Sequence, residues 1–427
     1  MLSGLIATLR GNFSPLRDAN FRTYLGGQAI SLIGTWLQVA AMGWVVWKLT
    51  GEATALGTVN ALSSLPLLLL SPWTGVWADR LDRRKLLIYT QAGAMLLAFI
   101  LAYLTQTELV QLWHVYALSF ALGVISALDF PVQQAFLGDL TGMASIRKAI
   151  NLNITILQVS RILGPALAGF IIGQAGAALA FWLNGLSFLA VIISLVLVRA
   201  RQVRSAAAGG KSGSFGEALR FMTGQPRMID MILFMILTTF FGLSIILNIL
   251  PAVADRVLGG DATTLGLLMA ASGAGALLGV MLVAPVVQSL KRTGVALSSL
   301  VMWMGLWFII FGATNNLAVA VFALFMCSIA PPAIMTTTNG MAQLMSPPAM
   351  RGRIISIAVT VSFGMQPLAA YMIGRLADVL GIGTAIDVYA VALMIGGALM
   401  LARPALRAWE FSARPEDPVV PAAAEAS

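Results

Sequence analysis

The chain is organised as long apolar runs that alternate with short polar breaks. The runs lie near residues 23–47, 53–77, 85–105, 112–136, 149–172 and 177–198, and again near 228–253, 264–288, 294–313, 317–342, 353–375 and 383–402. A helix of roughly 20 apolar residues crosses the hydrocarbon core of a bilayer. Within lipid such runs must be helices, because every backbone polar group needs a partner inside its own segment. The pattern therefore predicts an all-α membrane protein with twelve transmembrane helices.

The composition supports the bilayer as the solvent for most of the chain. Of the 427 residues, 59% are hydrophobic and only 10% are charged, whereas soluble proteins carry about 25% charged residues. The formal charge of +9 would suggest nucleic-acid binding in a soluble protein. Here the basic residues stand in the short breaks between spans, so they indicate membrane topology, and we expect no nucleic-acid partner.

The basic residues also predict the orientation of the spans. If both ends of the chain lie on one side, that side holds 22 of the 26 Lys and Arg residues, and the other side holds only Lys48, Arg256 and Arg375. Basic loops stay in the cytoplasm. We therefore expect a multi-pass protein of the bacterial inner membrane with both termini cytoplasmic. No cleavable signal peptide is evident, and the first span is expected to direct its own insertion.

The longest internal break divides the spans six and six. We assign residues 1–198 to an amino-terminal six-helix bundle, 199–227 to a cytoplasmic linker, and 228–427 to a carboxy-terminal six-helix bundle with a short tail. The segments 131–173 and 332–374 have the same length and related Gly and Pro patterns, which indicates an internal repeat. With one cysteine and one histidine, the chain has no disulfide and no Cys/His metal set. No nucleophile–base constellation is present, so we expect neither an enzyme nor a cofactor.

The break after the second span reads Gly75-Val-Trp-Ala-Asp-Arg-Leu-Asp-Arg-Arg-Lys85. It resembles the motif A signature of the major facilitator superfamily, although Asp82 stands where that pattern has a glycine. The resemblance implies a charge latch that forms in one conformation and breaks in the other; an ordinary basic topology loop is the alternative. Asp139 is the acid that we expect to pair with the arginines. The predicted latch residues are Gly75, Asp79, Arg80, Arg83, Arg84 and Asp139.

The fifth span contains Gly164-Pro-Ala-Leu-Ala-Gly169. It resembles motif C, the Gly-Pro signature of exporters in the same superfamily, with Gly164, Pro165 and Gly169 as the matching positions; simple helix packing by small residues is the alternative. Together with stretches in the first, fourth and sixth spans, this motif makes residues 14–200 similar to the bacterial exporter branch that includes the enterobactin exporters. The resemblance implies two six-helix bundles that rock about a central site.

Polar residues recur at helical spacing within several spans, which places them on shared helix faces. We interpret these faces as the lining of a central cavity, against the alternative that each side chain bonds to its own helix. The predicted lining residues are Gln28, Ser31, Thr35, Gln38, Ser126, Gln133, Gln158, Asn339 and Gln366.

Two charged residues, Asp129 in the fourth span and Arg161 in the fifth, are predicted to lie well inside the bilayer. Charges at that depth are costly and are usually functional. We expect Asp129 and Arg161 to form a charge pair that couples transport to protons, with a fixed structural ion pair as the alternative.

The sequence thus predicts a secondary active exporter of small amphipathic molecules, such as drugs or siderophores, that works by alternating access and exchanges its cargo for protons. A nutrient or metabolite importer of the same fold is one alternative. A lipid flippase or a transport-inactive membrane scaffold is another. The expected partners are the small-molecule substrate and the lipid bilayer, and we expect a monomer.

Overall fold

The computed structural model describes residues 14–198, 215–347 and 350–403, together with Leu406, Trp409 and Phe411. Within these ranges the chain is helical, in agreement with the predicted fold class. Eleven of the described helical segments are long and apolar enough to cross a membrane. The remaining predicted span corresponds to two shorter helices, Arg351–Gly364 and Gln366–Leu380, which meet at Met365.

The amino-terminal bundle consists of five helices after a short 3-10 turn, Ser14–Arg17. Its members are α2 (Ala19–Thr50), α3 (Ala53–Arg80), α4 (Arg83–Gln106), α5 (Leu112–Ala175) and α6 (Ala177–Leu197). Helix α5 contains two predicted spans, which meet at a kink where Gly142 has a φ of 70°. A left-handed φ is open to glycine because it has no Cβ, so Gly142 lets the chain reverse between spans.

The carboxy-terminal bundle follows a short helix, α7 (Phe215–Thr223), which lies within the predicted linker; residues 199–214 are outside the described part of the chain. The first two spans of this bundle are interrupted by π-helical turns. The elements are α8 (Pro226–Ile236), η2 (Leu237–Leu243), α9 (Ser244–Asn248), α10 (Leu250–Ala252), η3 (Val253–Val257), α11 (Ala262–Leu278), η4 (Gly279–Val283), α12 (Ala284–Ser289), α13 (Thr293–Ala313), α14 (Leu317–Ser328), α15 (Ala330–Met345), α16 (Arg351–Gly364), α17 (Gln366–Leu380) and α18 (Ile382–Ala402).

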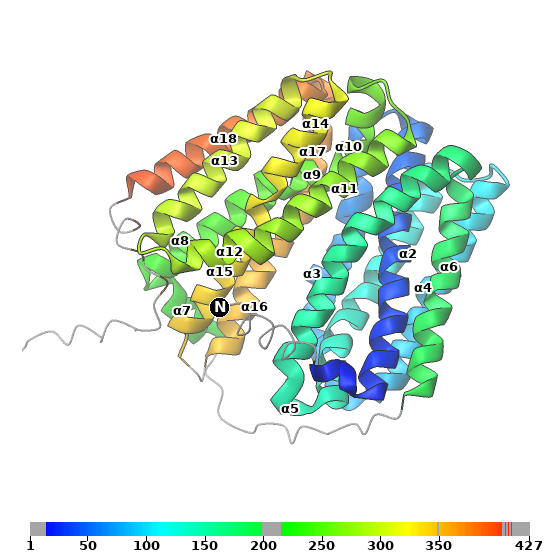
Figure 1. Cartoon of the computed structure of the whole chain (residues 1–427), viewed down its shortest axis with the longest axis horizontal. Coiled ribbons are helices and arrows are strands. Elements are labelled where there is room, and N and C mark those ends of the chain that lie inside the picture. Colours follow the sequence, from blue (N-terminus) through cyan, green and yellow to red (C-terminus); the bar gives the residue numbers. More distant parts are fainter. Residues whose placement is uncertain are drawn as a thin grey trace, which may run out of the picture.

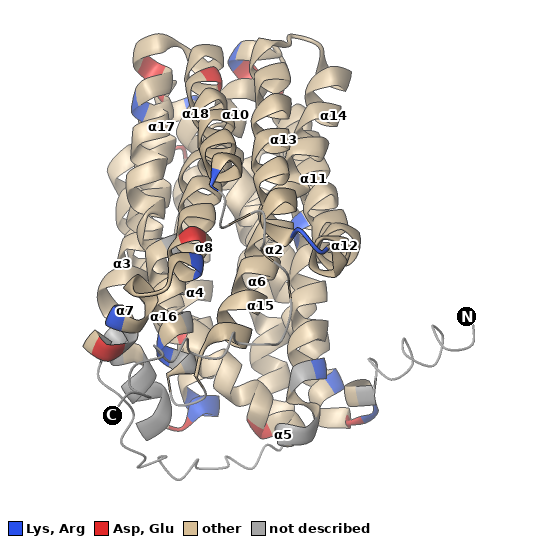
Figure 2. Ribbon diagram, turned by 90° about the vertical axis from the view of Figure 1, so that its left-hand side faces the viewer, with Lys and Arg blue, Asp and Glu red and all other residues tan. Residues whose placement is uncertain are grey.

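The two bundles stand side by side (Figure 1). We call the end that holds the breaks at 81–82, 142, 224–225 and 290–292 the linker side. The end that holds the breaks at 51–52, 107–111, 258–261 and 381 is the far side. Many of the charged residues lie near the upper and lower ends of the view in Figure 2, and a smaller number lie at mid-height. This distribution is the one that a hydrocarbon layer around the middle of the molecule requires.

Close packing inside the amino-terminal bundle depends on small residues. Helix α2 packs along both α5 and α6. A Cβ added at Gly164 of α5 would lie 2.5 Å from the Cβ of Trp36 and 2.8 Å from the carbonyl oxygen of Ile33. Asn184 of α6 donates a 2.6 Å hydrogen bond to Gln38 of α2. Without a hydrophobic force between helices in lipid, such close approach and buried polar contacts are what hold helices together.

We predict that Gly164→Ala destabilises the protein by about 1–3 kcal/mol, the usual cost of overpacking a close contact. The matched control is Gly26→Ala in α2, where an added Cβ would meet no atom within 4 Å. The thermal unfolding midpoint in detergent, followed by tryptophan fluorescence, should fall for Gly164→Ala only. Equal midpoints for the two variants would contradict the close α2–α5 contact.

Candidate functional site

The interface between the bundles is closed on the far side by contact between backbones. Along α5 and α11, a Cβ added at Gly266 would lie 2.6 Å from the carbonyl oxygen of Pro165 and 2.8 Å from the Cα of Gly169. Two turns further along α11, a Cβ added at Gly273 would lie 3.0 Å from the carbonyl oxygen of Arg161. Residues larger than glycine would hold the two helices apart at these points.

Helices α3 and α17 meet in a second close contact. A Cβ at Gly57 would overlap the carbonyl oxygen of Ala370, and one at Gly374 would overlap that of Ala53. Beside them, Asp378 of α17 accepts hydrogen bonds from the backbone N–H groups of Ala53 and Thr54, both at 2.8 Å, and from the Thr54 hydroxyl at 2.5 Å. The first N–H groups of a helix lack partners within it and carry partial positive charge. Asp378 therefore caps a helix of the opposite bundle.

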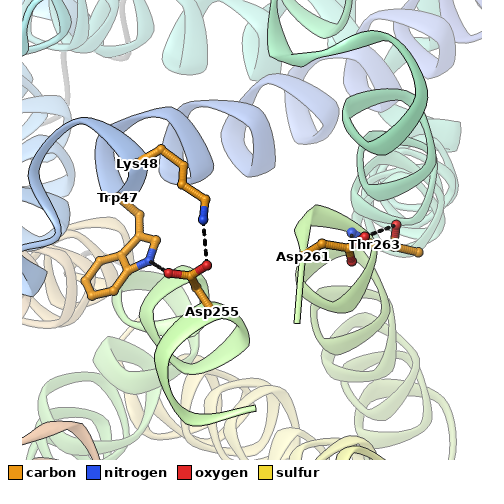
Figure 3. Close-up of polar contacts among 5 residues, drawn as sticks. All are labelled: Trp47, Lys48, Asp255, Asp261 and Thr263. Atoms are coloured by element: carbon orange, nitrogen blue, oxygen red, sulfur yellow. Dashed lines mark hydrogen bonds and ion pairs between the residues drawn. The ribbon is translucent and has the colours of Figure 1, made fainter. Parts of the chain in front are cut away.

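Asp255 provides a third far-side contact, shown in Figure 3. Its carboxylate accepts a 2.8 Å hydrogen bond from the indole N–H of Trp47 and a 2.6 Å bond from Lys48. Its neighbour Arg256 donates to the carbonyl oxygen of Gly51 at 3.0 Å and lies over the Trp47 ring. The Lys48 and Trp47 bonds hold the pKa of Asp255 below its usual range. The charged contact is therefore present at neutral pH and is lost only as the pH falls through that lowered value.

On the linker side the same face of α5 is uncovered. Thr155, Ile162 and Gly169 are spaced by seven residues and so share one helix face. Ile162 and Gly169 contact α11, whereas Thr155 and its neighbour one turn earlier, Asn151, are exposed. The carboxy-terminal bundle thus covers the far half of this face and leaves the linker half open. The interface is therefore closed at the far side and uncovered along this part of α5 at the linker side.

The structure places the predicted latch residues at the linker side and brings Arg83 and Asp139 together. The Nη1 of Arg83 lies 3.0 Å from each carboxylate oxygen of Asp139, and the two side chains are 9% and 4% exposed. Arg84 instead donates 2.5 Å bonds to the carbonyl oxygens of Leu195 and Val196, at the end of α6. The side chains of Gly75, Asp79 and Arg80 lie outside the described ones.

The predicted pairing of Asp129 with Arg161 is wrong. Asp129 accepts hydrogen bonds from the Thr90 hydroxyl at 2.5 Å and from the Gln91 amide at 3.0 Å, both on α4. Arg161 faces away from that cluster, with its guanidinium carbon 5.4 Å from the centre of the Trp36 ring. The prediction rested on the depth of both residues in the bilayer. Depth does not determine toward which neighbouring helix a side chain points.

The exporter-like motif lies partly in the interface. Gly164 packs on α2 within its own bundle, whereas Gly169 and the carbonyl of Pro165 contact Gly266 of α11. Nearby, Asp261 caps the start of α11 by accepting from the N–H groups of Thr263 and Thr264, and the Thr263 hydroxyl lies 3.5 Å from the carbonyl oxygen of Gly169. The close packing expected of these small residues therefore joins the two bundles.

The predicted cavity-lining residues lie in different environments. Gln38 turns toward α6, where it accepts the bond from Asn184, and Gln366 donates to the carbonyl oxygen of Thr239 at 3.3 Å. Both bonds lie within a single bundle, so these two side chains serve packing. Of the others, Gln28, Ser31 and Gln158 are buried, Thr35, Gln133 and Asn339 are half-buried, and Ser126 is exposed.

Sequence reasoning missed several residues that the structure places at important points. Asp255 and Asp378 carry no motif, and only their position at a span end beside the basic Lys48, Arg256 and Arg375 offered a signal. Trp36 lies in the first span, and no spacing or motif there marked it as a partner of Arg161. Asp387, in the second turn of α18, has a buried carboxylate oxygen without a hydrogen-bond partner among the described residues.

Comparison with known proteins identifies the family. The model of a family described as transmembrane secretion effectors matches residues 10–425. The chain is 24% identical, over 84% of its length and 90% of the relative's, to a staphyloferrin A transporter of Staphylococcus aureus. It is 21% identical, over 90% and 95% of the two lengths, to the multidrug efflux pump Tap of Mycolicibacterium fortuitum.

Solved transporter structures share the fold at low sequence identity. A bacterial homologue of the human lysosomal transporter Spinster, in an inward-facing and unoccupied conformation, matches with a TM-score of 0.72 and 14% identity, over 91% of this chain and 96% of the other. A D-xylose–proton symporter matches with a TM-score of 0.69 and 14% identity, over 92% and 99%. The family match spans nearly the whole chain, and the helical architecture agrees with it. The chain belongs to the transmembrane secretion effector family of major facilitator superfamily transporters.

Proposed function

We propose that the protein is a secondary active exporter of small amphipathic molecules that exchanges its cargo for protons by alternating access. The observation that carries this proposal is the interface between the bundles, closed by three contacts on the far side and uncovered along α5 on the linker side. A transporter held in one of two access states has this form. The family description and the drug-efflux relative support outward transport.

The distribution of basic residues supports a cytoplasmic linker side. The Lys and Arg residues in the described far-side loops and helix ends are Lys48, Arg256 and Arg375. Loops rich in basic residues are retained in the cytoplasm. With this orientation, the uncovered part of α5 lies toward the cytoplasm and the far-side contacts close the outer gate. An exporter takes up its cargo from this state.

Asp129 is our candidate for the proton-binding group. It lies in the amino-terminal bundle, half-buried, and its two bonds come from the neutral donors Thr90 and Gln91. An ionised carboxylate and a protonated carboxyl can both accept these bonds. A proton can therefore bind and leave without an ion pair being broken, which suits a coupling site better than a fixed salt bridge.

The fold itself does not fix the direction of transport, since the similar structures include a symporter. Direction is open to direct measurement in inverted membrane vesicles energised to an acidic lumen. A panel of drugs and siderophores is added to the vesicles one compound at a time. We predict that a transported compound raises the lumenal pH, because protons leave the lumen in exchange for each cargo molecule that enters it. A pH-sensitive dye reports this change.

Asp129→Asn is the coupling control in the same vesicles. It keeps an acceptor for Thr90 and Gln91 but cannot exchange a proton, so cargo should cause no change in pH. Vesicles that acidify further when cargo is added would contradict export and favour the importer.

The orientation has its own test in intact cells. An impermeant maleimide should label Leu109→Cys on the far side and should not label Lys211→Cys in the linker, each variant being made in a Cys327→Ala background.

The buried pair of Arg83 and Asp139 allows a test of the latch. We predict that Asp139→Asn lowers stability by about 3–5 kcal/mol, because it removes the negative charge that Asp139 places against a buried arginine. We also predict that it lowers transport by about tenfold, the factor that 1.4 kcal/mol produces. Thermal unfolding in detergent and vesicle transport measure the two effects.

The double variant Arg83→Met with Asp139→Leu separates structure from switching. Apolar replacement of a buried pair usually restores stability. If the pair acts as a latch, the double variant regains the wild-type unfolding midpoint while its transport stays low. Recovery of both properties would show that the pair serves folding alone.

A further inference from the structure

Arg161 lies at the meeting point of both bundles, half-way along the described span 148–175. It shares a small pocket with Trp36 from α2 and with residues of the opposite bundle that include Leu247, Met269 and Ser272. The pocket has a volume of about 10 Å³, roughly the space of one water molecule. It marks the depth at which the covered half of the interface gives way to the uncovered half.

None of the described residues that line the pocket is acidic. The residues around it are apolar except for Arg161 itself, Ser272 and the indole of Trp36. The ion pairs found between described residues join Lys48 to Asp255, Arg83 to Asp139 and Arg403 to Asp230. Asp129, the carboxyl that the sequence predicted as its partner, is bonded to α4. In the described part of the chain, the contact recorded for the guanidinium is the Trp36 ring.

A guanidinium at the middle of a membrane span is costly unless a negative charge accompanies it. A stacked tryptophan recovers only part of that cost. Arginine is also the side chain whose fork of N–H groups matches a carboxylate or phosphate oxygen pair. A cation kept at this position without an acid of its own is suited to an anion that comes and goes.

We propose, on the basis of the export function above, that Arg161 is the anchor for an anionic group of the cargo. The transported molecules are then organic anions with a carboxylate or similar oxyanion and an apolar or aromatic body. Arg161 binds the oxyanion and Trp36 contacts the body. Ser272 assists, because it accepts a 3.0 Å bond from the Ser328 hydroxyl and so has its own O–H free to donate into the pocket.

The geometry also explains how cargo reaches the pocket. The exposed residues Asn151 and Thr155 lie two to three turns from Arg161 on the linker half of the same helix. An anion entering from that side meets Arg161 where the interface begins to close. Since the pocket is now too small for cargo, binding must part Trp36 and Arg161 of one bundle from Leu247 and Ser272 of the other. Cargo entry is thereby linked to movement of the bundles.

The test compares two xanthene dyes of similar size and opposite charge, carboxyfluorescein and rhodamine 123, in vesicles containing wild type, Arg161→Gln or Arg161→Lys. We expect wild type to accumulate carboxyfluorescein and Arg161→Gln to lose this by about tenfold, with rhodamine 123 unaffected; tenfold corresponds to 1.4 kcal/mol. Arg161→Lys keeps the charge and should retain much of the anion transport. Equal effects of Arg161→Gln on both dyes, or preference of the wild type for rhodamine 123, would overturn the proposal.

Stability without cargo gives a second, independent readout. If no acid in the protein balances Arg161, the purified Arg161→Gln variant should unfold at the same temperature as wild type or higher. A fall of several degrees would show that the guanidinium is satisfied within the protein and would overturn the anion site. Failure of wild type to move any compound of the drug and siderophore panel would instead count against the export function itself.

Discussion

The arrangement of the whole molecule depends on the contact between the two bundles at the far side. Gly266 and Gly169 bring α11 and α5 together backbone to backbone, and Gly57 and Gly374 do the same for α3 and α17. The carboxylate of Asp378 then caps α3 across the interface. Because lipid supplies no hydrophobic force between helices, closeness of this kind and polar contacts must hold the bundles together.

None of these contacts is strong enough to be permanent. Lys48 and Asp255 are 51% and 31% exposed, and exposed ion pairs contribute only about 0–1 kcal/mol. A helix cap contributes about 1 kcal/mol. Moving a two-state equilibrium from 1:99 to 99:1 takes about 5.5 kcal/mol, which is more than a few such contacts provide together. An interface built from several weak contacts can open as a unit when an anion binds at Arg161, at the depth where the covered region ends.

The apolar periodicity predicted the spans well, because bilayer thickness and backbone hydrogen bonding leave a chain of this composition few alternatives. The Arg83–Asp139 pair was also predictable, since the motif contains Arg83 and Asp139 precedes a break between spans on the same side. The Asp129–Arg161 pair was not, because one helix face can turn toward either of two neighbours. The contact of Asp378 with Ala53 between the bundles, and that of Arg161 with Trp36 inside the amino-terminal bundle, join residues that no local pattern connects.

The central claim is that the far-side contact must open in every transport cycle. Thr54→Cys with Asp378→Cys, in a Cys327→Ala background, replaces the 2.5 Å hydrogen bond between these side chains with a pair of thiols that oxidation can join. Transport in reconstituted vesicles should stop when the disulfide forms and return when dithiothreitol reduces it, with the reduced double variant as its own control. Undiminished transport by fully cross-linked protein would contradict the account.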